Sequence, residues 1–124
     1  MHMHRGMRKI YALSGLLLFT SVLPSAEMWT GQLLDANCVR QHSEIQKYEE
    51  CTPAEATSSF VLQTSGQMLK LDANGDKKAV EAWREYMSSA DRAVDPGARS
   101  RALSALIQGT VTEDRIRVDN LLLR

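Results

Sequence analysis

Two kinds of hydrophobic periodicity alternate along residues 28–123, and their order limits the folds open to this chain. Period-two, strand-like patterns appear before and after a single helical pattern. The strand-like stretches are residues 28–34, 59–64, 67–72, 102–112 and 115–123, and the helical stretch is residues 73–89. Five strands with one helix between the third and the fourth predict a mainly β domain.

Two pairs of these strands have the sequence signature of a hairpin. Ser65-Gly66 separates the second strand from the third, and Glu113-Asp114 separates the fourth from the fifth. Short polar or glycine-containing connections between alternating strands favour tight antiparallel turns. On the last strand, Ile116, Val118 and Leu121 are expected to share one face.

The first strand and the helix each carry a further local signal. Gly31 interrupts residues 28–34, which predicts a bulge or a tight bend there. Along residues 73–89 the helical period predicts one buried face, with Asn74 or Asp76 near the N-cap. The residues of that face are Ala79, Val80, Trp83, Tyr86 and Met87.

A polar excursion of residues 35–53 follows the first strand. The elements then come in the order of an OB-fold, a small and partly open β-barrel: strand, excursion, strand, strand, helix, loop, strand, strand. The alternative is an α+β arrangement in which the helix packs over an open antiparallel sheet. Residues 91–101 contain Pro96-Gly97 and no apolar period, so we expect an exposed loop. Residues 27–124 suffice for one domain.

Residues 1–26 have the features of a secretory signal. Basic Arg5, Arg8 and Lys9 precede the apolar run of residues 10–23, and Pro24-Ser25-Ala26 follows it. The run is shorter than the roughly 20 apolar residues that a membrane span needs. We expect cleavage near Ala26, a periplasmic or secreted domain and no stable membrane span afterwards. Retention as an anchor is the alternative, and Met7 is an alternative start.

Export bears directly on the two cysteines. In an oxidising compartment, Cys38 and Cys51 favour a disulfide that closes the polar excursion of residues 35–53. The alternative is a metal or redox site in which Cys38, His42 and Cys51 are ligands for zinc or copper. Asp35 or Glu50 is then the candidate fourth ligand.

Charge and motif content argue against two classes of function, nucleic-acid binding and catalysis. Removing three of the 15 basic residues with the signal leaves 12 against 15 acidic ones, a net charge of −3. Nucleic-acid binding draws its affinity from clustered Lys and Arg, so we expect no nucleic-acid partner. No nucleophile elbow, zinc-protease motif or phosphate loop occurs in the sequence. We therefore expect a protein that is not an enzyme and needs no cofactor.

Two other patterns favour structural interpretations. Asp72 to Asp76 begins like a calcium loop, but Lys77 and Trp83 stand where that loop needs Gly and Glu, which favours a turn and a helix N-cap. Four aromatic residues form a candidate stacking platform, although without a basic groove core packing is the better interpretation. They are Trp29, Phe60, Trp83 and Tyr86.

Several of these residues together resemble a group of small exported bacterial proteins of unknown function. Gly31, Asp35 and Cys38 match their G-x-x-x-D-x-x-C pattern, with His42 and Cys51 downstream. The stretch Gln108-Gly109-Thr110-Val111-Thr112 resembles the strand that opens their closing hairpin. The resemblance implies an OB-like fold and an exported location, and it implies no activity.

Three functions from different classes follow. The first is a noncatalytic exported binding module that uses the barrel face for an unknown small molecule, glycan or envelope protein. The second is a small metal-binding or redox module that uses Cys38, His42 and Cys51. The third is a structural envelope protein.

Overall fold

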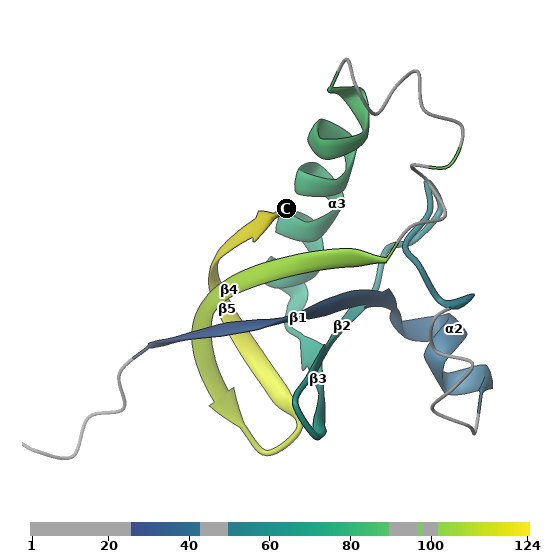
Figure 1. The fold of residues 1–124 in the computed structure, drawn as a ribbon. Helices are drawn as coiled ribbons and strands as arrows, with labels where there is room; N and C mark the ends of the chain where they lie inside the picture. The colour runs from purple at the N-terminus through teal and green to yellow at the C-terminus, as the bar shows by residue number, and fades with distance from the viewer. Residues whose placement is uncertain (1–25, 43–49, 90–96, 98–101) are drawn as a thin grey trace, which may run out of the picture.

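The computed structural model describes residues 26–42, 50–89, 97 and 102–124, and the five strands within them form a closed barrel (Figure 1). The strands follow each other around the barrel in the order β1-β2-β3-β5-β4. The chain order of the elements is β1 (Glu27–Asp35), α2 (Ala36–Gln41), β2 (Phe60–Thr64), β3 (Gln67–Leu71), α3 (Ala73–Ser88), β4 (Leu103–Thr112) and β5 (Arg115–Leu123).

A short parallel contact closes the barrel. The other four pairings around it are antiparallel, whereas β3 and β5 run parallel and pair only at Lys70 with Arg115 and Leu71 with Ile116. This closed arrangement, with α3 between the third and fourth strands, is that of an OB-fold-like barrel. The fold prediction is confirmed, and the alternative of an open antiparallel sheet is wrong.

Both predicted hairpins are present. β2 and β3 pair up to Thr64 and Gln67 around a two-residue turn, where Gly66 has the positive φ of 73° that glycine tolerates. In the β4–β5 hairpin the register shifts at Gln108 and Gly109. The shift changes which side of β5 faces inward, so Leu121 packs against the same core as Ile116 and Val118.

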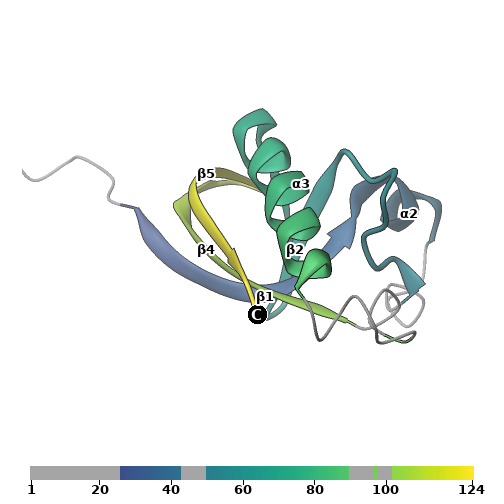
Figure 2. The ribbon, with the colours of Figure 1, turned by 90° about the horizontal axis from the view of Figure 1, so that it is seen from above.

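Gly31 does not mark a bulge. Pairing between β1 and β4 runs unbroken from Glu27 to Leu33, and β1 curves along the barrel wall (Figure 2). A Cβ at position 31 would lie 2.3 Å from the carbonyl oxygen of Gln63. The glycine is therefore needed because the backbone of β2 approaches β1 too closely for any side chain.

The helix α3 packs on the barrel core through the face that its period predicts. Ala79, Trp83 and Met87 are buried, and Val80 and Tyr86 are partly buried against the same cluster. The barrel contributes the other buried members of this cluster: Leu33, Phe60, Leu62, Leu69, Leu71, Leu103, Ala105, Ile107, Ile116 and Val118. Core packing is thus confirmed for the aromatic residues, because Trp29 also packs against this cluster.

The N-cap of α3 is Asp72, and the prediction of Asn74 or Asp76 is wrong. Asp72 Oδ1 accepts hydrogen bonds from the amides of Gly75 (2.9 Å) and Val118 (3.2 Å), so it joins the helix to β5. Asn74 and Asp76 serve other elements. Asn74 donates to the Val118 carbonyl, and Asp76 accepts from the Phe60 amide at 2.9 Å.

A second, smaller core lies outside the barrel, beneath α2. Leu33 and Leu34 are consecutive in β1 and both are 0% exposed. Since adjacent strand residues face opposite sides, the outer face of β1 must also be covered. The cover comes from α2 and from the segment around Cys51, which pack on Leu34 and Val61.

The predicted disulfide joins the two parts of this cover. Cys38 in α2 is bonded to Cys51, with their Cα atoms 5.4 Å apart. Asp35 caps α2, because its Oδ1 accepts from the amides of Asn37 (2.9 Å) and Cys38 (3.2 Å). Its Oδ2 accepts from the buried Thr57 hydroxyl at 2.7 Å, so one carboxylate ties the strand, the helix and the returning chain together.

Other predictions fall on parts of the chain that the structure leaves undescribed. The signal segment lies outside the described residues except for Ala26, and the predicted loop of residues 91–101 lies outside them except for Gly97. Within the described part of the chain, no helix is long and apolar enough to cross a membrane.

The substitution Asp35→Ala is expected to lower the free energy of unfolding by about 2 to 3 kcal/mol. It removes an N-cap, worth about 1 kcal/mol, and leaves the buried Thr57 hydroxyl without its acceptor. Urea unfolding measures the change. The control is Glu81→Ala on the exposed face of α3, which should stay within about 0.5 kcal/mol of the parent. Equal stabilities of the two variants would contradict the role given to Asp35.

Reduction of the Cys38–Cys51 disulfide is expected to lower the free energy of unfolding by about 3 kcal/mol. The bond spans a sequence separation of 13. Closing a loop of about that length lowers the entropy of the unfolded chain, which raises its free energy by about 3 kcal/mol. Urea unfolding with and without a reductant measures the difference. Unfolding curves that coincide would show that the bond does not stabilise the native state.

Candidate functional site

A groove of about 450 Å³ lies on the outside of the barrel, between α2 and the turn that joins β4 to β5. We call it the α2 groove. The residues that line it are Ala36, Val39, Arg40, Ser59, Val61, Met68, Lys70, Asp114 and Arg115. They come from three parts of the sequence: the first excursion, the β2–β3 hairpin, and the β4–β5 connection. In OB-folds the corresponding strand face and loops carry ligands.

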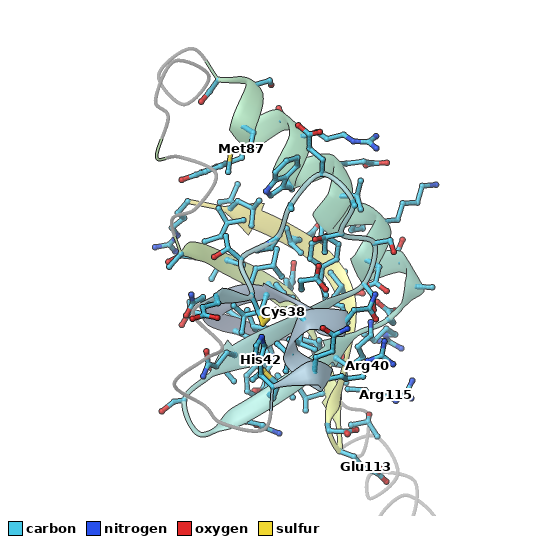
Figure 3. The ribbon with its side chains drawn as sticks, turned by 90° about the vertical axis from the view of Figure 1, so that its right-hand side faces the viewer. Cys38, Arg40, His42, Met87, Glu113 and Arg115 are labelled. Atoms are coloured by element: carbon cyan, nitrogen blue, oxygen red, sulfur yellow. A yellow bond between two sulfur atoms is a disulfide. The ribbon has the colours of Figure 1, made fainter. Side chains whose placement is uncertain are left out.

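The two side walls of the groove each present an arginine. Arg40 is in the last turn of α2, and Arg115 is the first residue of β5. Figure 3 shows these two residues on the same side of the molecule. The Arg40 guanidinium donates to Asn37 Oδ1 within α2, which orients it along the helix.

The floor of the groove is apolar. Val61 is 7% exposed, and Val39 and Met68 are partly buried against the outer core. The alternation along β3 explains why Met68 is available there. Leu69 and Leu71 point into the barrel, so Met68 and Lys70 face outward beneath α2.

Lys70 is the best-anchored cation of the groove. Its Nζ forms an ion pair with Asp76 at 3.1 Å and donates to the Leu71 carbonyl at 2.7 Å. This is the sole ion pair between side chains of the described residues. Asp114 also lines the groove, so among its described residues three cations face one carboxylate, and Asp76 already neutralises one of those cations.

A smaller hollow of about 220 Å³ adjoins the α2 groove. Lys70 and Arg115 line both, and Thr110, Thr112 and Arg117 line only the smaller one. The two hollows therefore meet where β3 and β5 pair. Arg115 stands between them.

The predicted metal ligands do come together. One ligand atom each from Cys38, His42 and Cys51 lies within 4.8 Å of the others, and Figure 3 shows Cys38 and His42 close to each other. Both sulfur atoms are engaged in the disulfide, however, and cysteine binds zinc or copper as the free thiolate. Asp35, a predicted fourth ligand, uses both oxygens in hydrogen bonds to protein groups. The present bonding state therefore weakens the metal interpretation.

Sequence reasoning did not identify the groove residues. No function was predicted for Arg40, Lys70, Asp114 or Arg115. One signal was accessible: Phe60, Val61 and Leu62 are consecutive apolar residues in β2. Because adjacent strand residues face opposite sides, such a run indicates that the outer face of the strand is also covered. The aromatic residues proposed for stacking do not line the groove.

Comparisons with protein-family models, with curated proteins and with solved structures find no match to this chain. The resemblance to small exported bacterial proteins therefore stays a prediction that rests on short motifs. The residues of those motifs that the structure describes serve the fold, because Gly31 admits the backbone of β2, Asp35 caps α2 and Cys38 forms the disulfide. The structure thus establishes an OB-fold-like barrel, and function has to be inferred from its groove.

Proposed function

We propose that this protein is an exported, noncatalytic binding module whose ligand site is the α2 groove. The observation that carries the proposal is the position of the groove on the β2–β3 face, between the first and last loops of the barrel. This is the place where OB-folds bind their ligands. Its volume of about 450 Å³ lies in the range of small-molecule sites.

The lining supports a small molecule over a nucleic acid or a glycan. Single-stranded nucleic acids bind OB-folds through bases stacked on aromatic side chains. None of the described residues that line the groove is aromatic, and the floor consists of Val39, Val61 and Met68. An aliphatic floor favours an aliphatic or compact apolar ligand body.

Export is part of the proposal and rests on the N-terminal sequence together with the disulfide. A Cys38–Cys51 bond is compatible with an extracellular or otherwise oxidising compartment, where such bonds persist. The helix α2 has six residues, too few for a stable isolated helix. Because α2 forms one wall of the groove, we expect that wall to be most stable in a compartment where the disulfide stays intact.

Filling the groove is expected to abolish ligand binding. Met68→Trp places a large side chain on the floor at a strand position that accepts aromatic residues. Compounds that shift the amide signals of the parent protein in a fragment screen should bind this variant at least about tenfold more weakly, a difference of roughly 1.4 kcal/mol. The control is Leu122→Trp on β5, where the side chain is already 59% exposed and lies outside the groove lining. Binding that survives Met68→Trp would contradict the proposed site.

A metal or redox module is the second candidate, supported by the proximity of Cys38, His42 and Cys51. The binding-module proposal and this alternative predict different bonding states. We expect protein purified without reductant to lack free thiols and to contain no zinc or copper, as measured by thiol titration, intact mass and metal analysis. Two free thiols with a bound metal that His42→Ala removes would favour the second candidate. A structural envelope role would leave the α2 groove without a ligand.

A further inference from the structure

We propose that the ligand of the α2 groove is a small amphipathic organic carboxylate. The inference rests on the proposed function and names the chemical class that the same groove selects. The carboxylate would bind Arg115 and Arg40 on the two walls. The aliphatic body would lie over Val39, Val61 and Met68 on the floor.

The charge argument begins where β3 meets β5. Lys70 and Arg115 are direct partners in that parallel pairing, so two cations occupy neighbouring positions on the barrel surface. Like charges at such positions repel each other unless anions compensate them. Asp76 compensates Lys70 through the 3.1 Å ion pair. Among the described residues, no side chain forms an ion pair or a hydrogen bond with the Arg115 guanidinium.

Arg115 is therefore the cation available to a ligand. Its guanidinium carries five N–H donors in a planar fork that matches a carboxylate. Arg40 lines the same groove from α2 and donates to Asn37, which leaves further donors on its guanidinium. Two arginines in one groove offer donors to one anionic group.

The floor explains why the anion should carry an apolar body. Val61 is 7% exposed and belongs to the outer core, and Val39 and Met68 extend that apolar surface into the groove. An aliphatic chain laid on this surface would remove it from water, which favours binding. By excluding water, the same chain would strengthen the attraction between its carboxylate and the arginines.

Asp114 provides a test, within the same groove, of whether the ligand carries a negative charge. Its carboxylate lines the groove beside Arg115 and would repel a bound anion. Asp114→Asn should therefore strengthen the binding of a carboxylate, whereas Arg115→Gln should weaken it. A groove that selects only apolar surface would respond to neither change.

The experiment compares octanoate with octanol, which share the same aliphatic chain and differ in charge. Amide chemical shifts of the protein report binding, and thermal unfolding verifies that each variant is folded. We expect the parent to bind octanoate more tightly than octanol. Arg115→Gln should weaken octanoate binding about tenfold, leave octanol binding unchanged and reduce the dependence of octanoate binding on salt.

The matched control is Arg117→Gln, two residues along the same strand. Arg117 lies outside the α2 groove and contacts Thr110, so its loss should leave octanoate binding within about twofold of the parent. Equal affinity for octanoate and octanol, or octanoate binding indifferent to Arg115→Gln and Asp114→Asn, would overturn the carboxylate assignment. Absence of binding by both probes would overturn it as well. The proposed function fails separately, if no compound of any class shows binding that Met68→Trp removes.

Discussion

The candidate site depends on one constraint: the polar excursion of residues 35–53 is attached to the outside of the barrel. Asp35 ends β1, caps α2 and accepts a hydrogen bond from Thr57 on the returning chain. The disulfide between Cys38 and Cys51 fastens the same two segments covalently. A helix of six residues does not persist by itself in water, so these bonds and the small outer core decide whether α2 exists at all.

The same attachment divides the molecule into a scaffold and a site. The barrel core is filled by alternating residues of all five strands and by α3, and it would be complete without α2. The α2 groove, in contrast, exists only because α2 stands opposite the β4–β5 turn across the β2–β3 hairpin. Loops placed on a rigid barrel can change their ligand without disturbing the core, which is why the fold alone does not define the function.

The structure explains the motif formed by Gly31, Asp35 and Cys38. The glycine lets the Gln63 carbonyl approach, the aspartate starts the helix and the cysteine secures it. None of these three residues lines the α2 groove. A chain that resembles this one through the motif would therefore share the attachment of the excursion, while its groove residues would remain free to differ.

Local periodicity was sufficient for the five strands, both hairpins and the buried face of α3, because each depends on residues that are close in sequence. It was also sufficient for pairing the cysteines, since the described chain offers each of them only the other. The N-cap of α3 was misplaced and the helix α2 was missed, because Asp72 and Asp35 are held by bonds to Val118 and Thr57, which are distant in sequence. Barrel closure through β3 and β5 and the placement of Arg40 and Arg115 in one groove were decided by tertiary structure, because no local pattern records which distant charges a fold brings together.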